Sequence, residues 1–168
     1  MKTWMKLLLI TLPVAILSLP LGQVLWPPTS HGTDAGTGMP GLMLLGFIGV
    51  AIFEGLALGV GISFLVLGLP VVRRLAAATG NGAVVWSAFG SIIWFLVSWW
   101  PHDGLHRSMG DDMAALLVVE YAFHVTLIAA GAILAYAFVR AAAGLLANRP
   151  SDPAVAYRDT LVQATSEV

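Results

Sequence analysis

Two pairs of polar residues have types and spacing that suit a metal ion. His102 and His106 are four residues apart, and so are Glu120 and His124. This spacing places two side chains one turn apart on the same face of a helix. Neutral imidazole and ionised carboxylate are ligands of first-row transition metals. If the intervening chain forms a hairpin, the pairs meet, and Asp103 adds a carboxylate as a ligand or as a partner that orients an imidazole.

The methionines suggest which metal this would be. Apart from Met1 and Met5, they stand at the ends of two apolar stretches, in pairs four residues apart. Thioether is a soft ligand that selects Cu(I), so copper is favoured over zinc or haem iron. Methionine is also an ordinary gap-filler at interfaces. The predicted secondary group for metal capture contains His31, Met39, Met43, Met109 and Met113.

A second interpretation of the polar residues needs no metal. Glu54, Glu120 and His124 are ionisable groups within apolar stretches. Such groups are costly in a membrane and mark either function or a buried polar pair. They could form a track for a proton, an ion or a small solute, or a structural clamp in which Glu54 pairs with His124. Asp111 and Asp112 are expected to cap the helix that follows them.

The composition excludes several classes of protein. Hydrophobic residues make up 58% of the 168-residue chain and charged residues 10%, and the mean hydropathy is +0.88. About 25% of a typical globular chain is charged. A soluble enzyme, a disordered chain and a nucleic-acid-binding protein are therefore excluded. The absence of cysteine excludes disulfides and thiolate metal sites, and suits an oxidising outer compartment.

Apolar stretches long enough to cross a bilayer set the expected fold. About 20 helical residues span the hydrocarbon core, and lipid allows only backbones that satisfy their own hydrogen bonds. The sequence predicts an all-α integral membrane protein, an antiparallel four-helix transmembrane bundle in residues 1–140 with a cytoplasmic tail at 141–168. The expected spans are 7–26, 41–69, 83–100 and 113–139, joined by loops at 27–40, 70–82 and 101–112.

The basic residues predict the orientation of these spans. Arg107 alone falls on the side of the first and third loops, and the positive-inside rule then makes both termini cytoplasmic. The chain is expected in the inner or plasma membrane, with residues 7–26 as an uncleaved anchor because no small-x-small cleavage pattern follows them. The residues on the predicted inner side are Lys2, Lys6, Arg73, Arg74, Arg140, Arg149 and Arg158.

Small residues in the second stretch predict close helix packing. Ala51, Gly55, Gly59 and Ser63 recur every four residues and form one smooth ridge. Such ridges let membrane helices approach each other within the bundle or across to a partner chain.

Three functions remain open at this point. The chain is a metal-handling protein or a subunit of a membrane oxidase-type complex, a transport element, or a non-catalytic scaffold subunit, and it is not expected to be an enzyme on its own. The expected partners are the bilayer and either other membrane subunits or a second copy, with no nucleic acid.

Overall fold

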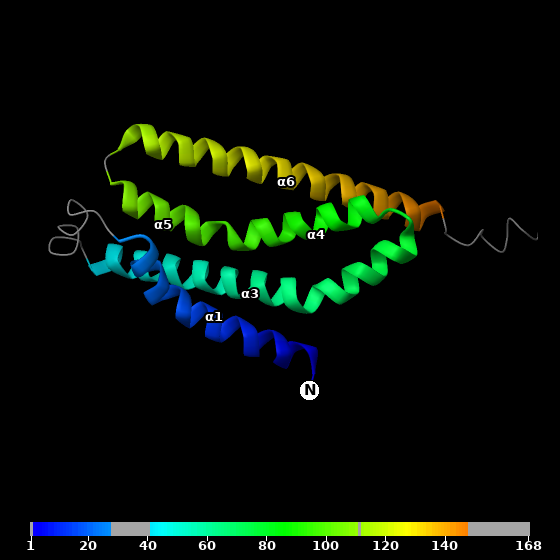
Figure 1. The fold of residues 1–168 in the computed structure, drawn as a ribbon, viewed down its shortest axis with the longest axis horizontal. Helices are drawn as coiled ribbons and strands as arrows, with labels where there is room; N and C mark the ends of the chain where they lie inside the picture. The colour runs from blue at the N-terminus through cyan, green and yellow to red at the C-terminus, as the bar shows by residue number, and fades with distance from the viewer. Residues whose placement is uncertain (1, 28–40, 111, 148–168) are drawn as a thin grey trace, which may run out of the picture. The chain divides into compact units, whose positions relative to one another are not determined.

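Every element in the described part of the chain is a helix. The computed structural model describes residues 2–27, 41–110 and 112–147, and Figure 1 shows their course. Three helices are long and apolar enough to cross a membrane, or up to four if a bent pair counts as one span. The expectation of an all-helical fold with helices long and apolar enough to cross a membrane is confirmed. The helices are α1 (Thr3–Leu25), α3 (Gly41–Thr79), α4 (Gly82–Val97), α5 (Trp99–Met109) and α6 (Met113–Ala147).

The segment that carries His102 is helical, not a loop. The expected third span continues past Trp100 as α5, which is bent by 42° from α4. Pro101 has no backbone N–H for the carbonyl of Val97, and its ring clashes with that carbonyl, so the helix bends there. The N–H of His102 already donates to the carbonyl of Ser98 at 3.1 Å. The prediction of a loop over 101–109 is therefore wrong.

The second expected loop is also shorter than predicted. Helix α3 continues through Pro70 to Thr79, and α4 begins at Gly82. Proline is tolerated in long membrane helices, so Pro70 does not end the helix. The turn comes at Gly80, whose φ of +65° is a left-handed conformation that glycine adopts without strain. Helix α6 likewise extends past the expected end at residue 139.

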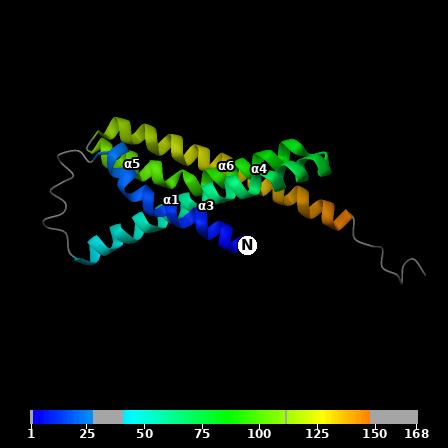
Figure 2. The same ribbon diagram turned by 60° about the horizontal axis from the view of Figure 1, so that its bottom comes forward.

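Gly55, Gly59 and Ser63 of the predicted ridge face α1, which crosses α3 in Figures 1 and 2. A Cβ atom added at Gly55 would lie 2.7 Å from Oγ of Ser18 and 3.1 Å from the carbonyl oxygen of Ala15. At Gly59 it would collide with the backbone of Thr11. The two backbones approach this closely only because these positions have no side chain.

A hydroxyl pair closes the same contact. Ser63 is fully buried, and its Oγ lies 2.9 Å from Oγ1 of Thr11. The Ser63 hydroxyl also lies 3.3 Å from the carbonyl oxygen of Leu7, to which it donates. The buried residues of α1 are Thr11, Ser18 and Gly22, which form the stripe facing α3. The sequence analysis missed this stripe, although its spacing is visible in the sequence.

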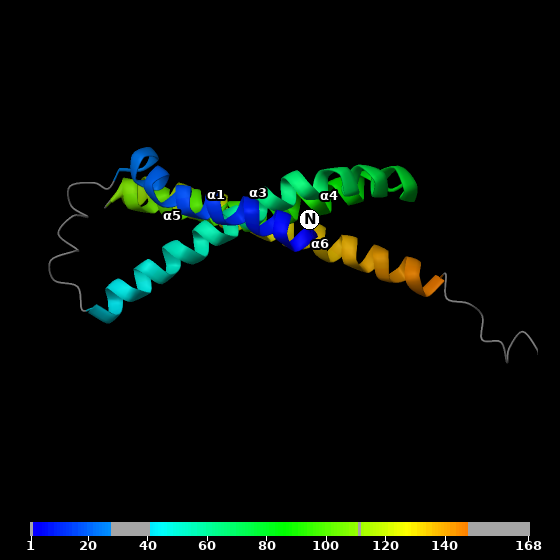
Figure 3. The ribbon, with the colours of Figure 1, turned by 90° about the horizontal axis from the view of Figure 1, so that it is seen from below.

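The end of α1 also holds α5. The indole Nε1 of Trp100 donates to the carbonyl of Ser18 at 3.2 Å. The rings of Trp26 and Trp100 meet edge to face, with their centroids 4.7 Å apart. Gly104 is buried against the ring of Trp26, so a side chain at this position would collide with the indole. One side of α5 is therefore covered by the end of α1, as Figure 3 shows.

Candidate metal centre

A tight turn brings α6 back against α5. Gly110 has a φ of +57°, which lets the chain reverse directly after α5. Oδ1 of Asp112 accepts hydrogen bonds from the N–H groups of Ala114 at 3.2 Å and Ala115 at 3.1 Å. The capping prediction is confirmed for Asp112, whereas Asp111 lies outside the described residues. The hairpin that the metal hypothesis requires is thus present.

Three of the predicted ligands meet across this hairpin. Nε2 of His106 lies 2.6 Å from Oε1 of Glu120, and Nε2 of His102 lies 3.4 Å from the same oxygen. All three atoms lie within 4.8 Å of one another. The side chains are 16% exposed for His102, 32% for His106 and 37% for Glu120. The cluster is therefore partly shielded and open on one side.

Neither imidazole forms a well-directed hydrogen bond through Nε2. In the described part of the chain, the Nε2 atoms of His102 and His106 are buried and have no hydrogen-bond partner. Both nevertheless lie near Oε1 of Glu120, so the oxygen sits off the direction in which a ring N–H would donate. Three ligand atoms that converge in this way are an arrangement that a bound cation could occupy.

Aromatic rings fix the imidazole of His102. It stacks on Phe123, with centroids 3.9 Å apart and planes 24° apart. Phe123 in turn meets Trp99 at 5.0 Å. The centroids of His102 and His106 are 4.5 Å apart. This packing restricts the ring of His102 and keeps its Nε2 beside Glu120.

His124 contacts the other oxygen of the carboxylate. Its Nδ1 lies 2.9 Å from Oε2 of Glu120 and 2.8 Å from the backbone carbonyl oxygen of the same residue. The side chain is 62% exposed. The two carboxylate oxygens therefore have different neighbours, and His124 is outside the group of three converging atoms.

Asp103 and Glu54 belong to a different contact. Oδ2 of Asp103 accepts a hydrogen bond from Nε of Arg107 at 3.1 Å. The carboxyl group of Glu54 lies close to Asp103 and to the charge of Arg107. Asp103 thus faces α3 while its neighbour His102 faces α6. The pairing of Glu54 with His124 is not what the structure has, because Glu54 pairs with Asp103 instead.

The methionine group is only partly described. Met109 ends α5 and Met113 begins α6, so both flank the turn at Gly110. Met113 is largely exposed. His31 and Met39 lie outside the described residues, and so does the side chain of Met43. Secondary metal capture stays a prediction.

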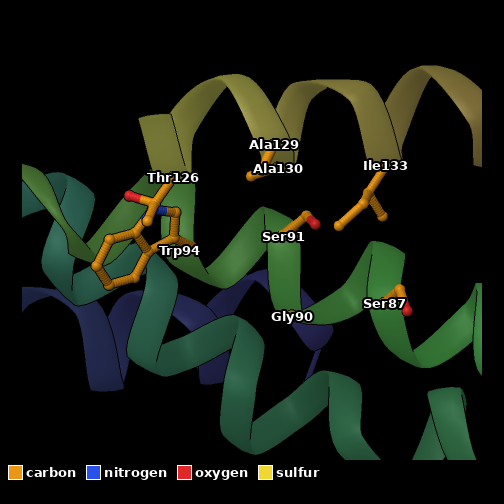
Figure 4. A pocket seen from close by; sticks show the side chains of 8 residues that line it. All are labelled: Ser87, Gly90, Ser91, Trp94, Thr126, Ala129, Ala130 and Ile133. Atoms are coloured by element: carbon orange, nitrogen blue, oxygen red, sulfur yellow. The ribbon is translucent and has the colours of Figure 1, made fainter. Parts of the chain in front are cut away.

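A groove of about 420 Å³ lies beside α4 and α6, further along the helices from the turn. Figure 4 shows Trp94 and Ser91 on one side of it, and Thr126 and Ile133 on the other. The hydroxyl of Thr126 is already bonded to the carbonyl oxygens of Ala122 and Phe123. None of the described residues that line the groove is titratable, so it adds no acid, base or imidazole to the site.

Comparison of the chain with known protein families, with curated proteins and with solved structures gives no match. The chemistry is therefore inferred from geometry. Two imidazoles and one carboxylate around a common point form a donor set that binds zinc, copper or iron. Three protein ligands leave a coordination position open for water or for an exchanging ligand.

Proposed function

We propose that His102, His106 and Glu120 bind a divalent first-row transition metal ion, copper(II) most tightly, at one end of a helical membrane bundle. The observation that carries this proposal is the convergence of three ligand atoms within 4.8 Å. Metal–ligand distances of about 2.0–2.1 Å put neighbouring ligand atoms about 3.4 Å apart in a tetrahedral site. The separation of His102 from the carboxylate, 3.4 Å, fits this value, whereas that of His106, 2.6 Å, is shorter and would have to widen around a metal ion.

A structural clamp explains the same residues less well. In a clamp, each imidazole would direct an N–H at its own carboxylate oxygen. Here both Nε2 atoms lie beside the same oxygen, Oε1, and Oε2 has neither of them as a neighbour. A cation between the three atoms would satisfy both nitrogens and the charge of the carboxylate together.

The donor types support copper(II) and a site that exchanges its metal. Nitrogen and oxygen ligands hold copper(II) more strongly than the other first-row divalent ions, with zinc the main competitor. Glu120 is 37% exposed, and closed structural sites shield their ligands more fully. The chain then acts in metal handling or as a subunit of a membrane oxidase-type complex. The basic residues favour an extracytoplasmic site with both termini inside.

Metal stoichiometry tests this function. The full-length protein, purified in lipid nanodiscs and stripped with a chelator, is dialysed against copper(II) or zinc(II) and measured by mass spectrometry. We expect about one ion per chain, and less than a tenth of that after the double substitution His102→Ala with His106→Ala. Wild-type protein that takes up no more metal than empty nanodiscs would contradict the proposal.

Transport is the second candidate, favoured by the contact between Glu54 and Asp103. Neighbouring carboxyl groups within membrane helices occur in proton paths. Glu54 contacts Asp103, however, whereas Glu120 contacts His106 and His124. A proton flux in liposomes that Glu54→Gln abolishes and His106→Ala leaves intact would favour this function over metal binding.

A further inference from the structure

The imidazole of His124 contacts Oε2 of Glu120, the carboxylate oxygen that is not beside His102 and His106. We propose that His124 is a positioning residue that fixes Glu120 with Oε1 toward the metal, and that His124 does not bind the metal itself. The inference rests on the proposed metal site and assigns His124 a role other than that of a ligand.

The position of Nδ1 defines the proton on the His124 ring. This nitrogen lies 2.8 Å from the backbone carbonyl oxygen of Glu120 and 2.9 Å from its Oε2. Both neighbours are acceptors, so Nδ1 carries the proton. It donates to the backbone carbonyl and contacts Oε2 at ion-pair distance. A protonated nitrogen has no lone pair for a metal. The free lone pair is then on Nε2, at the far side of a ring that is 62% exposed.

The contact between Nδ1 of His124 and Oε2 restricts a flexible ligand. A glutamate side chain can rotate its carboxylate out of a site, and a single partner on Oε2 removes much of that freedom. With Oε2 held by His124, Oε1 remains beside the Nε2 atoms of His102 and His106. Removing a partner that orients a ligand typically lowers metal affinity by about 10–100-fold.

Copper(II) affinity, measured by competition with a chelator, tests this role in full-length protein in nanodiscs. His124→Ala is expected to lower the affinity by about 10–100-fold. His124→Asn, whose amide can donate to Oε2, is expected to return it to within about threefold of wild type. Tyr121→Phe, at an exposed position of the same helix, is the matched control and should leave the copper(II) affinity unchanged.

A double-mutant cycle separates positioning from ligation. If His124 acts through the carboxylate, its removal matters little once that carboxylate is gone. In the Glu120→Gln background, His124→Ala should therefore lower the copper(II) affinity by less than about a further threefold. Electron paramagnetic resonance of the copper should show two nitrogen couplings in both wild type and His124→Asn. Additive losses, or a nitrogen coupling lost with His124, would overturn the inference, as would an unchanged affinity in His124→Ala. Failure of the wild type to bind copper would instead overturn the metal site itself.

Discussion

Nε2 of His106 lies 2.6 Å from Oε1 of Glu120, although the two residues belong to different helices. The turn at Gly110 and the cap at Asp112 bring these helices together. His102 approaches the same oxygen from one turn earlier on α5. A single carboxylate oxygen therefore has two imidazole nitrogens beside it, and the account of the site depends on this convergence.

Substitutions on the two sides of α5 should separate metal binding from packing. We expect His106→Ala to lower copper(II) affinity by at least about 100-fold, because it removes one of three ligands. Asp103→Asn should change the affinity by less than about threefold, because Asp103 contacts Arg107 and Glu54 instead. Competition with a chelator measures both affinities. Equal losses in the two variants would mean that Asp103 belongs to the site.

Metal binding should weaken as the pH falls. Imidazole must lose its proton to bind a metal, and ordinary histidine titrates near pH 6.5. With two imidazole ligands, copper(II) affinity should fall by up to about 100-fold per pH unit below about pH 6. Equilibrium dialysis between pH 5 and pH 7.5 measures this slope, and circular dichroism reports whether the helices persist. A flat profile would exclude imidazole ligation.

A methyl group at Gly59 should destabilise the bundle. Its Cβ would collide with the backbone of Thr11, and overpacking of this kind costs about 1–3 kcal/mol. Gly46→Ala is the matched control in the same helix, since nothing lies within 4 Å of a Cβ at that position. The free energy of unfolding in mixed micelles measures both variants. The packing of α1 on α3 described above would be contradicted if the two substitutions had the same effect.

Removing the bend should disturb the metal site without destabilising the helix. Pro101→Ala restores a hydrogen bond to the carbonyl of Val97 and removes the clash that bends the chain. The imidazoles of α5 would then shift, and ligand positions tolerate only about 0.5 Å of displacement. We expect copper(II) affinity to fall by about tenfold or more while the thermal midpoint stays or rises. Pro70→Ala, in a helix without ligands, serves as the control.

The sequence predicted the ligand cluster because short-range periodicity determines which residues share a helical face. A single hairpin was enough to bring the pair His102 and His106 together with the pair Glu120 and His124. The course of α5 was not predictable in the same way, because Pro101 permits either a loop or a bent helix. The packing of Gly104 against Trp26 and of His102 against Phe123 favours the helix.

The rotation of each helix about its own axis was beyond the reach of sequence reasoning. The spacing of Asp103 allowed it to be a ligand, and only the rotation of α5 turns it toward Glu54. His124 was predicted as a ligand because it lies one turn from Glu120. The same spacing equally lets its ring donate a hydrogen bond to that carboxylate, and sequence periodicity cannot distinguish these two arrangements.

X-ray absorption spectroscopy of the copper(II)-loaded full-length protein tests the central claim most directly. We predict a first shell of nitrogen and oxygen atoms at about 2.0 Å with the multiple scattering of two imidazole rings. The scattering contribution of one imidazole ring should disappear in His106→Ala. A spectrum without imidazole scattering, or one that His106→Ala leaves unchanged, would contradict the account.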